Sequence, residues 1–556
     1  QFTRQYIGIY LRNQCNGNNI SKNLLDNNNW YGLYFETECN NNILQGNEAF
    51  ESEYGIYIHN NCDYNKIIEN VANHNDYYGI YIYRYCDHNN ITKNIANSNY
   101  DYGLYLFFLC KYNNITNNIL INNNYYGIYL ERACDHNIIL NNTSKSQGYF
   151  YQYKGIFLQG CGHNLIKNNN LSYNLCGIEL WSSCFNNIIE NEIYHNYWGG
   201  NGIVLQVFSS YNNIINNSIY GEGNGIFLSQ SYNCRIFNNN LFDITELGIE
   251  IRNTNGTILS GNKMKGNGIF LDGDFDQLTK FTIYTNNTVN GKPIYYYVNK
   301  TGLGKENFTN AGQIILINCN NSLISDLNVS NSSIGISSYY SVNLRILNNT
   351  IFFSKKCGIY LYKTNYSTII NNNFKGINPD IIEVDCEGNI FDQPSINPII
   401  YDEDDDQKEE KKLDRNAFTL NFLLILGSIS IITLLLFYYY LMINKLHRNH
   451  YFNKNKKLKT GLGIFPTTRA IMEEIIEESS FFQLLEGEIS ASNTESLKKI
   501  NLERVSEELL ENIALIKMSK SNKKEFIIEL LALSDDERLM IINSILNRNN
   551  SNNILD

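Results

Sequence analysis

Cysteines followed closely by histidines are the first residues in this sequence that could do chemistry. Residues 86–88 and 134–136 both read Cys-Asp-His, and residues 161–163 read Cys-Gly-His. Cysteine and imidazole suit soft and borderline metal ions when they converge on one point. His136 and His163 fall on neighbouring copies of the repeat described below, so they are the pair that could share an ion. The alternative is a column of small apolar thiols packed in a core, with the histidines on the adjacent turn.

The acidic residues raise a second possibility, which is cleavage or epimerisation of a polysaccharide. Hydrolysis needs two carboxylates about 5–10 Å apart, and Asp272, Asp274 and Asp276 form the densest acidic cluster. This cluster resembles the start of a calcium loop, but it lacks the glycine and the terminal glutamate of an EF-hand. Glu179 and Glu250 stand alone on their repeats. We therefore assign no catalytic residue and keep the enzyme as an alternative.

All of these residues lie within a sequence repeat that is marked by a recurring glycine. Most spacings between its glycines are 23 or 24 residues, and the motif around each is close to Tyr-Gly-Ile-Tyr-Leu, with a second apolar pulse at Asn-Asn-Ile. Alternation of this kind is typical of strands, and so short a unit can bury its apolar face only against copies of itself. We predict an all-β parallel β-helix of about fifteen rungs, one repeat per rung. The glycines are Gly8, Gly32, Gly55, Gly79, Gly103, Gly127, Gly155, Gly177, Gly202, Gly225, Gly248, Gly268, Gly312, Gly335 and Gly358.

Equivalent positions of successive rungs stack in such a fold, so the repeat predicts columns of like side chains. Seven residues after the glycine, a cysteine column is expected to hold buried, reduced thiols: Cys15, Cys39, Cys62, Cys86, Cys110, Cys134, Cys184 and Cys319, with Cys161 one position early. Asparagines are expected to bond from rung to rung at the bends. We place them at Asn19, Asn42, Asn90, Asn114, Asn187 and Asn213.

An outward column of aromatic residues lies two residues after the glycine. Flat rings at intervals of ~4.8 Å could stack on successive sugars, although stacked tyrosines also stabilise neighbouring rungs without any ligand. The candidate glycan-binding residues are Tyr34, Tyr57, Tyr81, Tyr105, Tyr129 and Trp181.

The repeats of residues 6–390 resemble those of the NosD-like β-helix family, a branch of the carbohydrate-binding and sugar-hydrolase β-helices. The resemblance rests on Asn-Asn-Ile and Gly-Ile-Tyr-Leu at most turns, and the segments at 290–297 and 311–319 look like an element of archaeal members. It implies a right-handed solenoid and specifies the fold more strongly than the activity. It also implies a further alternative function, copper handling.

An apolar segment at 417–443 carries no charge and is long enough to span a bilayer. An acidic linker at 399–416 precedes it and a basic segment at 444–466 follows it, so the positive-inside rule places the C-terminus in the cytosol and the β-helix of residues 1–398 outside. Glycosylation sequons agree with this topology. They begin at Asn19, Asn90, Asn114, Asn170, Asn255, Asn286, Asn307, Asn328 and Asn365.

Residues 467–556 are predicted to form a small cytosolic helical domain, because apolar residues recur there at helical spacing. No nucleotide-binding or nuclease signature is visible in it, which leaves a protein partner as the interpretation. The net charge of −11 argues against nucleic-acid binding. We predict no cofactor.

Together these patterns predict a single-pass protein of the cell membrane whose outer β-helix binds glycans or a partner surface. A polysaccharide-active hydrolase, lyase or epimerase is the first alternative, and a copper-handling protein is the second. Converging carboxylates would favour the enzyme, and converging His and Cys would favour the metal.

Overall fold

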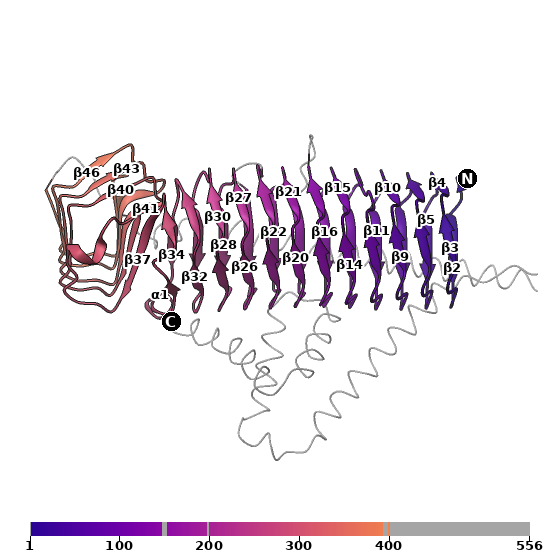
Figure 1. Ribbon diagram of the computed structural model, residues 1–556, viewed down its shortest axis with the longest axis horizontal. Helices are drawn as coiled ribbons and strands as arrows, with labels where there is room; N and C mark the ends of the chain where they lie inside the picture. The colour runs from indigo at the N-terminus through magenta and orange to yellow at the C-terminus, as the bar shows by residue number, and fades with distance from the viewer. Residues whose placement is uncertain (1, 147–152, 197–199, 378, 393–398, 401–556) are drawn as a thin grey trace, which may run out of the picture. The chain divides into compact units, whose positions relative to one another are not determined.

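The computed structural model describes residues 2–146, 153–196, 200–377, 379–392 and 399–400 of the chain. They form an all-β, right-handed parallel β-solenoid of about 16 turns, as the repeat predicts (Figure 1). The span expected at 417–443 and the helical domain expected at 467–556 lie outside the described residues. Within the described part of the chain, no helix is long and apolar enough to cross a membrane.

Three parallel sheets run along the first section, and each rung contributes one strand to each sheet where all three strands form. Sheet one, of twelve strands, carries the Tyr-Gly-Ile-Tyr-Leu motifs. Its strands are β2 (Ile7–Arg12), β5 (Tyr31–Glu36), β8 (Tyr54–His59), β11 (Tyr78–Tyr83), β13 (Tyr102–Phe107), β16 (Tyr126–Glu131), β19 (Lys154–Gln159), β22 (Cys176–Trp181), β25 (Asn201–Gln206), β28 (Ile226–Ser229), β31 (Ile249–Arg252) and β34 (Ile269–Asp272).

Sheet two, also of twelve strands, carries the Asn-Asn-Ile motifs. Its strands are β3 (Asn19–Ser21), β6 (Ile43–Gln45), β9 (Lys66–Ile68), β12 (Asn90–Thr92), β14 (Asn114–Thr116), β17 (Ile138–Leu140), β20 (Leu165–Lys167), β23 (Asn187–Ile189), β26 (Asn213–Ile215), β29 (Arg235–Phe237), β32 (Ile258–Ser260) and β35 (Thr282–Ile283). Sheet three begins with β1 (Phe2–Thr3), β4 (Leu24–Asp26), β7 (Glu48–Phe50) and β10 (Val71–Asn73), and single bridges through Ile95 continue it. It goes on through β15 (Ile119–Ile121), β18 (Thr143–Lys145), β21 (Asn170–Ser172), β24 (Glu192–Tyr194), β27 (Ser218–Tyr220), β30 (Asn240–Phe242), β33 (Lys263–Lys265) and β36 (Thr288–Val289).

The interruption of the repeat after Gly268 is a junction between two sections of the solenoid. It contains α1 (Phe275–Thr279), an antiparallel turn from β36 into β37 (Lys292–Val298), and the 3-10 helix η1 (Lys305–Phe308). Beyond it, sheet three continues through β37 into β38 (Gln313–Ile317), β41 (Ile334–Tyr339), β44 (Cys357–Tyr362), β47 (Ile381–Val384) and β49 (Ile399–Ile400). Two short sheets complete these rungs: β39 (Leu323–Ser325), β42 (Arg345–Leu347), β45 (Thr368–Ile370), β48 (Ile390–Phe391); and β40 (Asn328–Ser330), β43 (Thr350–Phe352), β46 (Asn373–Lys375).

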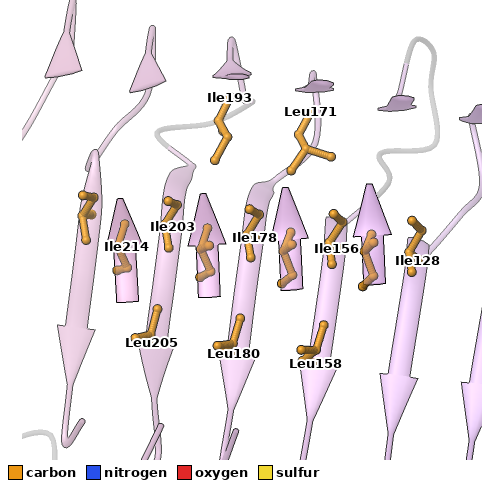
Figure 2. Close-up of a cluster of buried hydrophobic side chains, with 14 of the residues drawn as sticks. Ile128, Ile156, Leu158, Leu171, Ile178, Leu180, Ile193, Ile203, Leu205 and Ile214 are labelled. Carbon is orange, nitrogen blue, oxygen red and sulfur yellow. The ribbon is translucent and has the colours of Figure 1, made fainter. Parts of the chain in front are cut away.

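Columns of isoleucine and leucine fill the interior of the first section. Figure 2 shows Ile156, Ile178 and Ile203 in one column on sheet one, with Leu171 and Ile193 close to it. All five side chains are fully buried. Burying one such side chain stabilises the fold by about 1.5–3 kcal/mol relative to exposure, so the stacked columns supply the main driving force for folding.

The repeat glycine is required by close packing rather than by an unusual backbone angle. A Cβ atom on Gly32 would lie 2.6 Å from the carbonyl oxygen of Gly55 and 2.8 Å from the Cβ of Ala49. Neither neighbour is the flexible end of a long side chain, so a larger residue would have to move the backbone. The glycine therefore sets how closely sheet one approaches sheet three.

The cysteine column is present, and its members Cys39, Cys62, Cys86, Cys110 and Cys134 are fully buried. All thirteen cysteines are free thiols in the structure. The assignment of two later members was wrong. Cys161 lies in the column, since its backbone N–H donates to Ser183 Oγ, which occupies the same place on the next rung. Cys184 follows that place by one residue, because the turns after β19 and β22 are each one residue shorter than the turns before them.

Asparagine ladders bond the rungs together, mostly at other residues than those predicted. Asn118 shows the pattern: its Oδ1 accepts the backbone N–H of Asn94 at 2.9 Å and the Asn94 amide at 3.1 Å, and its Nδ2 donates to Ile91 O at 2.9 Å. Of the predicted residues, Asn42 lies in a ladder and is fully buried. The other five begin strands of sheet two and are not buried: Asn19, Asn90, Asn114, Asn187 and Asn213. Among these five, the Asn213 amide does donate to Asn187 Oδ1 on the neighbouring rung at 2.8 Å.

Candidate functional site

The outer face of sheet one carries most of the aromatic side chains that the sequence singled out. In β5, β8, β11, β13 and β16, three positions point outward: the residue before the glycine, and the residues two and four after it. Alternation breaks at the glycine, so that Tyr31 and Tyr34 lie side by side with ring centroids 4.7 Å apart. We call this set the aromatic face: Tyr31, Tyr34, Glu36, Tyr54, Tyr57, His59, Tyr78, Tyr81, Tyr83, Tyr102, Tyr105, Phe107, Tyr126, Tyr129 and Glu131.

The predicted tyrosine column lies at the centre of the aromatic face and is largely covered. The rings of Tyr57 and Tyr81 stack with centroids 4.8 Å apart and planes 5° apart, and Tyr105 on Tyr129 repeats this geometry. Tyr105 and Tyr129 are only 6% and 5% exposed, whereas Tyr34 is half-buried. Because each ring covers the face of the next, a ligand can meet only the edges and hydroxyl groups of this column. Ring-face stacking on sugars, the reason these tyrosines were chosen, is therefore not available to them.

The hydroxyl groups of the column are bonded diagonally to the neighbouring rung. Tyr34 Oη lies 3.2 Å from His59 Nδ1, Tyr105 Oη donates to Glu131 Oε2 at 2.5 Å, and Tyr129 Oη donates to Gln159 Oε1 at 2.9 Å. Burial lowers the pKa of His59 to about 4, so this imidazole is neutral at pH 7. Burial raises the pKa of all these tyrosines. Apart from the carboxylates of Glu36 and Glu131, the face is thus a set of neutral hydrogen-bonding groups over stacked rings.

Exposed rings occur beside this face, on the residue immediately before each strand. This corner column consists of Tyr6, Trp30, Glu53, Tyr77, Asp101, Tyr125 and Tyr153. Trp30 is 46% exposed, Tyr77 and Tyr125 are each 41% exposed, and Tyr153 is 47% exposed. The sequence analysis missed these residues. The signal that could have found them is an aromatic or acidic residue two positions before the repeat glycine on seven successive rungs.

The carboxyl groups of the corner column have raised pKa values. Burial raises the pKa of Asp101 to about 6. The pKa of Glu53 is also raised, by burial first and then by the nearby charge of Asp76. Each of these groups therefore favours its neutral form more than a solvated carboxyl does.

Trp181 lies at the end of β22, where it aligns with Gln159 on one neighbouring strand and with Gln206 on the other. It is 40% exposed. Two residues earlier on the same strand, Glu179 is bound by Lys154 at 3.0 Å and by the Gln206 amide at 2.7 Å. Trp181 is thus an exposed ring beyond the tyrosine column, and its part in binding stays a prediction.

His136 and His163 do come together, as their neighbouring rungs predict. Their rings stack with centroids 4.9 Å apart and planes 10° apart, within an exposed ring column that includes Tyr112 and Phe185. Parallel stacked imidazoles point their nitrogen atoms alongside one another, whereas a metal site needs them to converge. Among the residues that the structure describes, no three or more His, Cys, Asp or Glu side chains are placed to hold one ion.

The acidic cluster after β34 forms a helix cap. Asp274 is the N-cap of α1 and accepts the backbone N–H of Gln277 at 2.8 Å. Asp276 lies in the first turn and pairs with Lys280 at 2.5 Å, while Asp272 ends β34. An acidic residue at a helix N-terminus is stabilising in its own right. The cluster therefore has a structural explanation for two of its three carboxylates.

Comparison with known protein families agrees with the β-helix fold. A family model described as "Periplasmic copper-binding protein (NosD)" matches residues 1–126, and one described as "Right handed beta helix region" matches residues 144–269. The chain is a NosD-like β-helix repeat protein. Among functionally curated proteins, none matches the sequence of this NosD-like chain.

Several solved structures are similar to the NosD-like chain at low identity. A periplasmic alginate epimerase, AlgG, is 20% identical over 37% of this chain and 51% of its own, with a TM-score of 0.32. An alginate lyase from Paenibacillus sp. is 14% identical over 50% and 91%, with a TM-score of 0.25. The A-module of mannuronan C-5 epimerase AlgE6 from Azotobacter vinelandii is 12% identical over 71% and 85%, with a TM-score of 0.30. The match spans about half the length of the first of these epimerases.

Proposed function

We propose that this NosD-like chain binds a glycan along the aromatic face and the corner column beside it. The observation that carries the proposal is the series of exposed rings in the corner column, with Trp30, Tyr77, Tyr125 and Tyr153 each between 41% and 47% exposed. Exposed aromatic rings in a row are uncommon on a soluble surface without a partner. Their arrangement in one column along the rungs suits a linear polymer.

The corner column and the aromatic face offer a glycan different kinds of contact. The exposed rings of the corner column offer apolar surface on which pyranose rings can pack. Tyr125 and Tyr153 stack on each other with centroids 5.6 Å apart, so each of these two rings keeps one face for a ligand. The aromatic face offers hydroxyl groups and the neutral imidazole of His59 as hydrogen-bonding partners for sugar hydroxyls. Binding of this kind needs no catalytic carboxylate. The sheet-one carboxylates Glu179 and Glu250 are each paired with a cation.

Removing two of the exposed rings tests the proposal. We expect the double variant Tyr77→Ala, Tyr125→Ala to weaken binding of a retained polysaccharide by about tenfold or more, since stacking on one aromatic ring is worth ~1 kcal/mol or more. Affinity electrophoresis of the full chain measures the change. The matched control is Tyr366→Ala, which removes a ring of similar exposure, 56%, from the second section. Equal retention of the double variant and the control would contradict the proposal.

We further propose that the segment at 417–443 anchors this face outside the cell, with residues 467–556 in the cytosol available to a protein partner. The charge asymmetry on the two sides of that segment supports this topology. Antibodies against the β-helix should bind intact cells, and a C-terminal tag should resist protease until the cells are permeabilised. A tag digested on intact cells would reverse the topology.

A further inference from the structure

The carboxylates of the corner column differ from the glutamates on the strands of sheet one. Glu36 is bound by Arg12 at 3.0 Å, Glu179 by Lys154 at 3.0 Å, and Glu250 by Arg252 at 2.5 Å. In contrast, neither Glu53 nor Asp101 forms an ion pair with any residue that the structure describes.

These two carboxylates are also partly removed from water. Glu53 and Asp101 are both half-buried, and the exposed Asp76 lies close enough to Glu53 for their charges to repel. Partial burial of negative charge costs free energy unless a cation or hydrogen-bond donors compensate it. A cationic ligand would supply that compensation, and an anionic ligand would increase the repulsion.

Carboxylates and rings alternate along the corner column. Glu53, Tyr77, Asp101 and Tyr125 precede β8, β11, β13 and β16, and the backbone N–H groups of Tyr77, Asp101 and Tyr125 donate to Glu53 O, Tyr77 O and Asp101 O. At ~4.8 Å per rung, the two carboxylates lie roughly 10 Å apart, and so do the two rings. Over these four rungs, the column therefore repeats every second rung.

We propose that the glycan is a polymer of amino sugars whose ammonium groups pair with Glu53 and Asp101 while its pyranose rings stack on Tyr77 and Tyr125; this inference deepens the proposed function and rests on it. In a 1,4-linked chain that turns by half a turn at each sugar, every second sugar presents the same edge. A period of two rungs matches such a chain, with a ring and a carboxylate for each pair of sugars.

Three soluble hexasaccharides distinguish this ligand class from its neighbours: β-1,4-linked glucosamine, β-1,4-linked N-acetylglucosamine and mannuronate. Calorimetric titration of the full chain at pH 7 should show the glucosamine hexamer binding about tenfold more tightly than the acetylated one, because two ammonium–carboxylate pairs are worth ~0.2–1 kcal/mol each near a surface. The mannuronate hexamer should bind most weakly.

The double variant Glu53→Gln, Asp101→Asn should abolish the preference for glucosamine, so that the glucosamine and acetylated hexamers bind it with equal affinity. A control variant, Glu190→Gln, removes a carboxylate that pairs with Lys167 at 3.1 Å beyond sheet two and should keep the preference. The preference should also fall as the pH drops through about 6, where Asp101 gains a proton. The sugar amines gain protons rather than lose them as the pH falls, so a loss of preference reports the carboxylate.

Mannuronate bound as tightly as glucosamine, or a preference unchanged in the double variant, would overturn the inference and leave glycan binding intact. Binding of none of these hexamers, together with no retention on any polysaccharide, would overturn the proposed function as well. A glucosamine preference that disappears only when Glu53 and Asp101 are replaced supports both.

Discussion

Replacing Asn118 with alanine is expected to destabilise the first section of the β-helix by about 3 kcal/mol or more. The substitution leaves the buried N–H of Asn94 and its side-chain amide without their shared acceptor, and it removes the donor to Ile91 O. Each buried polar group left unpaired costs about 1–3 kcal/mol, and Asn118 is only 1% exposed, so water cannot replace the lost bonds. Urea denaturation of the full chain followed by circular dichroism measures the change.

The control is Asn114→Ala, on the same rung. Asn114 begins β14 and is half-buried outside the ladder, so its loss should change the free energy of unfolding by less than about 0.5 kcal/mol. Equal effects of the two substitutions would contradict a specific stabilising role of the buried ladder.

Replacing Gln313 with alanine is expected to loosen the junction between the two sections by about 2–5 kcal/mol. The side chain of Gln313 is fully buried, and it bonds to the edge strand β34 as another strand would: Nε2 donates to Ile269 O at 2.6 Å, and Oε1 accepts Ile269 N–H at 2.9 Å. Ser333 Oγ accepts the N–H of Gly268, and Tyr339 Oη donates to Leu271 O. The variant leaves one donor and one acceptor unpaired and creates a cavity.

Hydrogen exchange at the Ile269 amide reports opening of the junction directly. The exchange should accelerate by about 30-fold or more if the variant loses at least ~2 kcal/mol of junction stability. An uncovered strand edge also favours pairing between molecules, so the variant should self-associate in sedimentation experiments. Gln45→Ala, on the exposed end of β6, is the control. Unchanged exchange at Ile269 would show that Ser333 and Tyr339 cap β34 without Gln313.

The repeat spacing was sufficient to predict the fold, since a unit of 23 or 24 residues with strand periodicity leaves few other architectures. It did not determine the register of the asparagine ladders. Two asparagines stand together before the isoleucine on several rungs, and the strands of sheet two are only two or three residues long, so alternation cannot decide which one faces inward. The turn decides it: at 89–91 and 113–115 the first asparagine lies in the ladder and the second begins the strand. Turn length likewise puts Cys161 in the cysteine column and gives the place on the next rung to Ser183 rather than Cys184.

Solvent exposure of the aromatic rings was the property of the site that the sequence predicted least well. A tyrosine two residues after the glycine points outward, as alternation requires, but whether it meets solvent depends on the columns on either side. Tyr102, Tyr126 and Phe107 cover Tyr105 and Tyr129 from the side, and each ring covers the next along the column. The exposed rings of Trp30 and Tyr77 lie at the corner, where no alternating pattern points to them. Physical contact between columns, which no single repeat encodes, decides which rings are free.

The central claim is that these columns bind a glycan without cleaving it, and one measurement tests it most directly. The full chain is incubated with a panel of neutral, cationic and acidic polysaccharides, and both retention and newly released reducing or unsaturated ends are recorded. We predict retention on at least one polysaccharide, no release of ends, and loss of retention in the Tyr77→Ala, Tyr125→Ala variant. Released ends, or retention that the double variant keeps in full, would contradict the account.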